Sequence, residues 1–98
     1  MLRTPIHPGE ILADELEEIE LTAKQLADAL QVPPNRLYQI LSGKRSMTAD
    51  TALRLAAYFG TSPEFWLNLQ TRYDLKIVTR QSGDKIRSAV RPAKTQAA

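Results

Sequence analysis

The chain has 98 residues, of which 43% are hydrophobic, and its 13 basic and 11 acidic side chains give a formal net charge of +2. A chain of this length forms one domain with a single modest core, which excludes most multidomain enzymes. It contains no cysteine, so disulfides, thiol chemistry and cysteine-ligated zinc are excluded as well.

Helical spacing of apolar residues, together with helix-end signals, predicts five helices and an all-α fold. The first helix begins at Pro8, has Glu10 near its positive end and stops near Glu20. The second begins after Thr22, which forms a capping-box pattern with Gln25. The residues expected to face inward from these two helices are Leu12, Leu16, Ile19, Leu26, Ala27 and Leu30.

The third helix begins at Pro34 and ends at Gly43, the fourth lies between Thr48 and Gly60, and the fifth follows the Ser-Pro pair at 62–63. The third and fourth are expected to bury Leu37, Ile40, Leu41, Ala52, Leu55, Ala56 and Phe59. In the fifth, the residues at helical spacing are Phe65, Trp66, Leu69 and Tyr73.

Only three residues, 31–33, separate the second helix from the third, and two short helices joined by so tight a turn make a helix-turn-helix unit. We therefore expect a helix-turn-helix domain over residues 1–80. Residues 81–98 are basic and poor in apolar side chains, which predicts a partly mobile tail.

Acidic residues are absent between Asp28 and Asp50, although the chain as a whole is nearly neutral. The third helix begins inside this stretch. Pro34 suits the first helical position, whereas Pro33 before it supplies no capping oxygen. The first amides of the helix are therefore unpaired and well placed to meet an anion.

The outer face of the third helix presents the residue types that bind DNA, namely Asn35, Arg36, Tyr38 and Gln39. Asn and Gln can bond adenine and Arg can bond guanine in the major groove, and all four can bond phosphate. The loop that follows carries the phosphate-binding candidates Ser42, Lys44 and Arg45. A solvated polar face is the alternative, but the acid-free stretch and the two-helix spacing favour duplex DNA as the partner.

Residues 22–45, "TAKQLADALQVPPNRLYQILSGKR", resemble the helix-turn-helix of the phage-repressor (XRE) family. "HPGEIL" at 7–12 and "SGKRSMTADTALRLAAYFGTSPEFWLNLQTRYDL" at 42–75 resemble the HigA antitoxins, also called the VapI group. The resemblance implies a bacterial protein that dimerises, represses its own operon at an operator and neutralises a small basic ribonuclease toxin of the RelE/HigB type.

Matched position by position, the base-reading residues of the family fall on Pro34, Asn35, Arg36 and Gln39. Its phosphate contacts fall on Thr22, Ala23, Ser42, Lys44 and Arg45, and Tyr38 is a further phosphate candidate. The family usually has Gly in place of Gln31, where a side chain in a left-handed turn costs about 1–2 kcal/mol, and Ser or Thr in place of Pro33. Because Pro34 and Ala23 lack polar side chains, base recognition is expected to rest mainly on Asn35, Arg36 and Gln39.

The fifth helix has more apolar residues than one buried stripe requires, and a homodimer interface would cover the surplus. Two-fold pairing also places the recognition helices of repressors about 34 Å apart. The expected interface residues are Trp66, Leu67, Tyr73, Leu75 and Ile77. Packing within the protomer remains the alternative for Phe65, Leu69 and Tyr73.

Six acidic and no basic side chains lie within residues 10–20, a charge that would attract a basic toxin. The candidate toxin contacts are Asp14, Glu17 and Glu18, although acids on a helix often only solvate it. His7, the single histidine, has no partner for catalysis or metal binding, so we expect it to pack or cap the first helix. No metal, cofactor or enzymatic activity is expected.

No apolar run approaches the 20 or so residues that a membrane helix needs, and the N-terminus lacks the apolar core of a signal peptide. These features predict a cytoplasmic protein with no membrane partner, at the nucleoid when bound to DNA. Two alternatives to an antitoxin stay open: a stand-alone transcriptional repressor with no toxin, and a protein-interaction module whose recognition helix no longer binds DNA.

Overall fold

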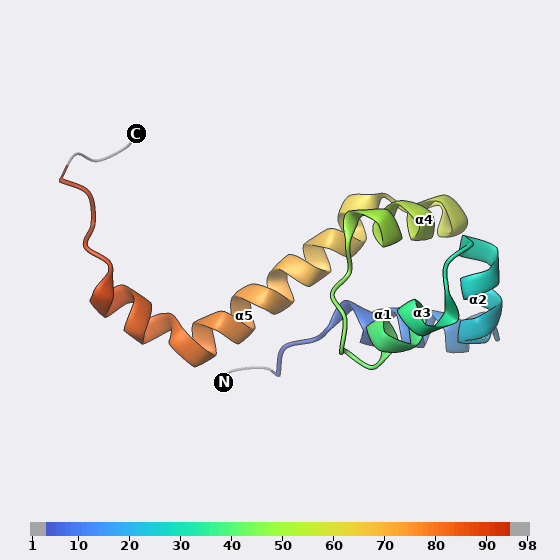
Figure 1. Cartoon of the computed structure of the whole chain (residues 1–98), viewed down its shortest axis with the longest axis horizontal. Coiled ribbons are helices and arrows are strands. Elements are labelled where there is room, and N and C mark those ends of the chain that lie inside the picture. Colours follow the sequence, from blue (N-terminus) through green and yellow to red (C-terminus); the bar gives the residue numbers. More distant parts are fainter. Residues whose placement is uncertain (1–3, 95–98) are drawn as a thin grey trace.

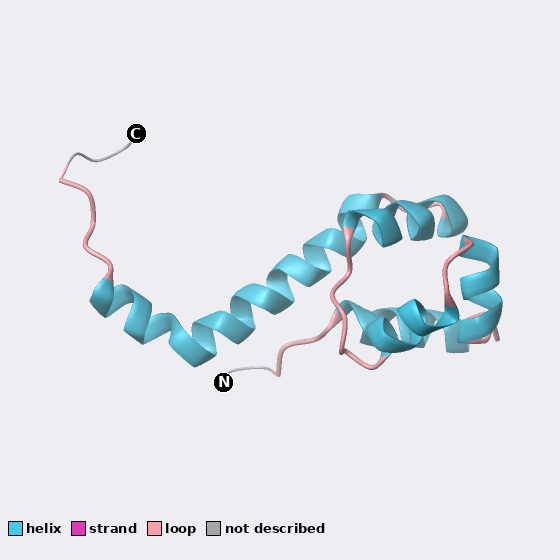
Figure 2. Ribbon diagram, viewed as in Figure 1, coloured by secondary structure: helices cyan, strands magenta, loops and turns pink. Residues whose placement is uncertain are grey.

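The structure, a computed structural model, describes residues 4–94 and contains five helices in that range. In chain order they are α1 (Pro8–Glu18), α2 (Ala23–Leu30), α3 (Pro34–Leu41), α4 (Ala49–Phe59) and α5 (Pro63–Ala89). No strand occurs among these residues, as Figure 2 shows. The predicted all-α fold with five helices is confirmed.

Helices α1 to α4 gather at one end of the molecule, and α5 starts beside α4 and runs away from them (Figure 1). The molecule is therefore elongated, with extents of 53 × 29 × 23 Å. Helices α2 and α3 pack against each other, and α1 packs against both α3 and α5. This arrangement leaves much of α5 as an arm outside the helical body.

The core lies between α1 to α4 and the beginning of α5. Leu12, Leu26, Leu37 and Leu55 are fully buried there, one from each of the first four helices. Burial of a Leu side chain stabilises a protein by roughly 1.5–3 kcal/mol, so these residues hold the four helices together. Trp66 closes the core from α5 and is only 2% exposed. Its prediction as a dimer-interface residue is wrong, because its own protomer covers the indole.

The helix ends follow the predicted signals. Thr22 and Gln25 form the expected capping box, in which each side chain accepts the backbone N–H of the other at 3.1 and 2.9 Å. Ser62 caps α5 by accepting the backbone N–H of Phe65 at 3.2 Å. Gly60 ends α4 in the left-handed conformation, with φ 74°, which is accessible to glycine at little cost.

The first helix ends earlier than predicted, at Glu18 instead of Glu20. Glu20 has a positive φ of 55°, and the backbone N–H of Leu21 donates to the carbonyl of Leu16 at 2.9 Å, so the chain turns back on the helix. This turn packs Leu21 against the core. Ile19, predicted to face inward, is instead 43% exposed because the helix ends before it.

The fifth helix ends later than predicted. It continues to Ala89, so the expected boundary at residues 80 and 81 falls inside α5, and the mobile tail predicted from residue 81 is wrong for residues 81–89. An ion pair between Asp84 and Arg87 lies in this part of the helix. A single glycine such as Gly83 costs a helix only about 1 kcal/mol, which is too little to end it. The last four positions of the predicted tail, 95–98, lie outside the described residues.

The turn between α2 and α3 contains the strained residue that the family resemblance implied. Gln31 adopts the left-handed conformation, with φ 61° and ψ 47°.

We expect Gln31→Gly to raise the free energy of unfolding by about 0.5–1 kcal/mol, because glycine removes the steric penalty but adds entropy to the unfolded chain. Urea unfolding measures the change. The control Ala29→Gly, at an exposed helical position, should lower stability by about 1 kcal/mol; a loss of stability in both variants would contradict the assignment of strain.

Candidate nucleic-acid interface

Helix α3 begins without a side-chain cap, as its proline pair predicted, but the prediction of unpaired first amides is wrong for Arg36, whose backbone N–H donates to the carbonyl of Pro33 at 3.0 Å. Pro34 is the first helical residue, and Pro33 at the N-cap makes no side-chain capping hydrogen bond. Leu37 and Ile40 are fully buried and fix the helix to the body. The opposite face holds the four residues predicted to contact DNA: Asn35 and Tyr38 are exposed, and Arg36 and Gln39 are half-buried.

The loop after α3 wraps around the end of that helix. The backbone carbonyl of Gln39 accepts the Ser42 hydroxyl at 3.1 Å and the backbone N–H groups of Lys44 and Arg45 at 2.8 and 3.2 Å. The side chain of Arg45 turns back as well, and its Nε donates to Oε1 of Gln39 at 2.8 Å. The structure thus brings the predicted base-reading residue Gln39 together with the predicted phosphate contacts of the loop.

The same loop is held from behind by α5, through a residue that sequence analysis did not single out. Gln70 is 6% exposed, and its Oε1 accepts the backbone N–H of Met47 at 2.7 Å. Its Nε2 donates to Asp74 at 2.9 Å, which fixes the orientation of the amide. A buried glutamine satisfied on both sides holds the loop in one position, so the basic residues are presented by a rigid support.

His7 has the capping role that was predicted for it. Its Nδ1 accepts the backbone N–H of Gly9 at 2.9 Å, and its own backbone N–H donates to Glu10 at 3.0 Å. The ring packs edge-on against Tyr73 of α5, with the centroids 4.9 Å apart. Desolvation by burial lowers the pKa of His7, while Glu10 and a hydrogen bond to the backbone of Arg45 act in the opposite direction.

The lowered pKa of His7 predicts a specific pH dependence of stability. The unfolded chain binds the proton near pH 6.5 and the folded protein only at lower pH, so the free energy of unfolding should be fully retained above 6.5 and decrease below it. Thermal unfolding between pH 7.5 and 5 measures the decrease. The variant His7→Asn can still cap Gly9 but does not titrate; an equally large decrease in that variant would assign the effect to other groups.

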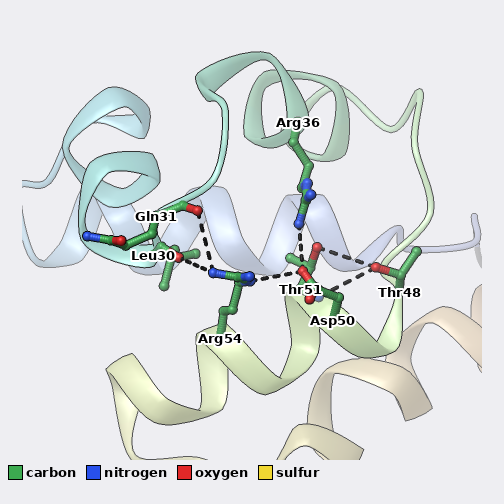
Figure 3. A network of polar contacts seen from close by, with 7 residues as sticks. All are labelled: Leu30, Gln31, Arg36, Thr48, Asp50, Thr51 and Arg54. Carbon is green, nitrogen blue, oxygen red and sulfur yellow. Dashed lines mark hydrogen bonds and ion pairs between the residues drawn. The ribbon is translucent and has the colours of Figure 1, made fainter.

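Arg36 does not project freely from α3 but pairs with an acid from α4. Its Nη1 lies 2.7 Å from Oδ2 of Asp50, and Nε of Arg54 donates to the same oxygen at 2.9 Å (Figure 3). The hydrogen bonds from Arg54 and then Arg36 lower the pKa of Asp50, so the carboxylate is ionised at neutral pH. Arg36 and Arg45 line one shallow recess of about 350 Å³ beside this pair.

Sequence analysis did not predict that Asp50 bonds both Arg36 and Arg54. Asp50 ends the acid-free stretch in the sequence, yet the fold returns it to the basic surface. The available signal was the spacing of Asp50 and Arg54 by four residues in α4, which is typical of an ion pair on one helix face. No local signal connects either residue with Arg36.

The remaining predicted sites lie on other parts of the body. Thr22 and Ala23 are at the start of α2, where the Thr22 side chain caps the helix. Asp14, Glu17 and Glu18 are exposed and line a shallow groove with Glu20. Of the predicted dimer residues, Leu75 is 63% exposed and Leu67, Tyr73 and Ile77 are half-buried on α5.

Within residues 4–94, no His, Asp and Glu side chains form a group of three suited to a metal ion. None of the helices in this range is both long and apolar enough to cross a membrane.

Comparison with known proteins shows the family to which this chain belongs. A helix-turn-helix family model matches residues 12–66. Virulence-associated protein I of Dichelobacter nodosus is 55% identical over 73 residues, which are 74% of this chain and 68% of that protein. The structure of a HigA-family addiction module antidote protein from Coxiella burnetii superimposes with a TM-score of 0.90 at 58% identity, covering 93% of this chain and all of the other. The chain belongs to the HigA branch of the XRE helix-turn-helix family.

The structure of another member of the HigA branch has been determined with DNA. The Pseudomonas aeruginosa antitoxin HigA with the higBA promoter matches with a TM-score of 0.87 and 42% identity, covering 91% of this chain and 98% of the other. The family resemblance drawn from the sequence is therefore confirmed.

Proposed function

We propose that this HigA-family protein is an antitoxin that represses its own operon by binding operator DNA as a homodimer and that neutralises a small ribonuclease toxin of the HigB/RelE type. The observation that supports it most is the single surface on which α3 and the loop 42–48 present Arg36, Gln39 and Arg45. A related HigA bound to its promoter supports the same use of this surface. The protein acts by binding and not as an enzyme.

On this proposal, α3 enters the major groove. Asn35, Arg36 and Gln39 read base edges, and Pro34 contacts them without hydrogen bonds. The phosphate contacts come from Tyr38 of α3, from Ser42, Lys44 and Arg45 of the loop, and from Thr22 and Ala23 at the start of α2. The hydroxyl hydrogen of Thr22 can still donate to a phosphate, because only its oxygen is used in the cap.

Two protomers pair through α5. Leu75 is exposed on the arm, and Val78, Ile86 and Val90 extend the apolar surface along it, at 47%, 46% and 62% exposure. Leu67, Tyr73 and Ile77 border this surface, so a second copy would bury more of all of them. Pairing of two arms would fix the distance between two α3 helices, which a two-fold operator requires.

The toxin binds to the acidic face of α1, which carries Asp14, Glu17 and Glu18. A basic ribonuclease would be attracted to this face, as other oppositely charged partners are.

We expect charge reversal in the double variant Glu17→Lys, Glu18→Lys to weaken toxin binding at least tenfold, with a strong dependence on salt concentration. Calorimetry with the purified toxin measures this; unchanged affinity would place the toxin elsewhere, and lost operator binding would indicate misfolding.

The proposal as a whole is tested by purifying the tagged protein from its native cell at low salt, with and without nuclease. A small basic protein that remains bound in stoichiometric amount after nuclease treatment would support an antitoxin, and inhibition of its ribonuclease activity would complete the test. Nucleic acid as the single partner would favour a stand-alone repressor. Failure of the protein to bind a duplex of its own promoter would contradict both.

A further inference from the structure

The carboxylate of Asp50 is fixed in place before any DNA arrives. Arg54 connects it to the turn between α2 and α3: its Nη1 donates to the backbone carbonyl of Leu30 at 2.8 Å and reaches that of Gln31 at 3.4 Å. Its Nε donates to Oδ2 of Asp50 at 2.9 Å. Figure 3 shows the resulting line of contacts from the turn, through Arg54, to Asp50.

Arg36 is held at the end of this line by one nitrogen. Nη1 of Arg36 bonds Asp50 at 2.7 Å, and a guanidinium has further N–H donors on its other nitrogens. Those donors can bond the two acceptors of a guanine while the contact with Asp50 is kept. The side chain is 29% exposed, so it is partly ordered but still accessible.

A carboxylate at this position is unfavourable for general DNA binding. Asp50 is the single acid among the residues that line the recess with Arg36 and Arg45, and it would repel the phosphates of any duplex. An ordered Arg36 gives a benefit only where a guanine faces it, because less side-chain freedom is then lost on binding. The pair therefore favours sequence preference over general affinity.

We infer that Asp50 and Arg54 are positioning residues for DNA recognition. They anchor Arg36 to the turn of the helix-turn-helix and so determine the preference of the protein for its operator over other DNA. This inference rests on the proposed binding of operator DNA. It differs from that proposal because neither residue was assigned to the interface and neither needs to touch a base.

The test uses fluorescence anisotropy with the full-length protein and two probes: a duplex of the promoter region of its own gene and a scrambled duplex of equal length and composition. We expect Asp50→Ala to weaken promoter binding about tenfold and to strengthen scrambled binding about twofold. A variant that only loses folded protein would bind both probes less well, and an acid that acts only by repulsion would make the variant bind both better; either result would overturn the inference.

Three variants make the result specific. Glu15→Gln removes one negative charge from an exposed position on α1 and should leave the ratio of the two affinities unchanged. In an Arg36→Met background, Asp50→Ala should cause no further loss at the promoter, because the residue it positions is gone. If Asp50→Ala does not fold, Asp50→Asn keeps the shape of the side chain and should lower the same ratio.

The anchoring is also tested without DNA. Nitrogen-15 NMR of the free protein should show restricted rotation of the Arg36 guanidinium, lost in Asp50→Ala and in Arg54→Met. Free rotation in the wild type would overturn the inference. Wild-type protein without preference for the promoter would overturn the proposed function and this inference with it, whereas a preference retained in Asp50→Ala would overturn the inference alone.

Discussion

Replacing Gly9 with alanine should lower the free energy of unfolding by about 3 kcal/mol or prevent folding altogether. A Cβ atom at Gly9 would overlap the carbonyl oxygen of Ile40 and lie 2.8 Å from its carbonyl carbon. Both of these atoms belong to the backbone of Ile40 in α3, and Gly9 lies in α1, so no side-chain rotation relieves the clash. The two helices would have to separate, and α3 would leave the position in which we propose that it meets DNA.

The matched control for this prediction is the same substitution in α5. A Cβ at Gly83 would meet only side-chain atoms, with Thr79 Cγ2 at 3.3 Å and an Arg87 nitrogen at 3.5 Å. Gly83→Ala should therefore raise stability by about 0.5–1 kcal/mol through better helix propensity. Chemical unfolding of both variants measures the difference. Equal effects at the two glycines would show that the contact between α1 and α3 is looser than the structure indicates.

Replacing Arg36 or Gln39 with alanine should in each case weaken operator binding by about 1–3 kcal/mol and weaken binding to random DNA much less. Both side chains lie on the outer face of α3, and each is oriented by a partner, Asp50 for Arg36 and Arg45 for Gln39. An ordered side chain that bonds a base edge contributes to specific binding and little to binding in general.

Lys44→Ala provides the contrast. Lys44 is exposed in the loop, where we propose that it contacts phosphate and not a base. Its removal should weaken binding to operator and to random DNA by similar factors. It should also reduce the slope of log affinity against log salt concentration by about one. Titrations at several salt concentrations separate the two patterns. If all three variants lost affinity equally on both kinds of DNA, the assignment of Arg36 and Gln39 as base-reading residues would be wrong.

The helices and most of their ends could be predicted from the sequence because their signals are local. A cap such as Thr22 acts on a residue three positions away, and Pro34, Gly60 and Ser62 act within one turn. The end of α5 was the main error, because basic and small residues after position 80 predicted a mobile tail. That composition is also compatible with a helix, and α5 continues through it to Ala89.

The sequence by itself determined the all-helical class, the helix-turn-helix spacing and the acid-free stretch, whereas the left-handed turn at Gln31 was implied by the family resemblance. Tertiary structure decided that Trp66 faces the core, that Gln70 holds the loop and that Asp50 lies against Arg36. These contacts join residues far apart in the chain: Asp50 is 14 positions from Arg36, and Gln70 is 23 from Met47. The relative placement of packed helices sets such distances, and burial of the shared core determines that placement.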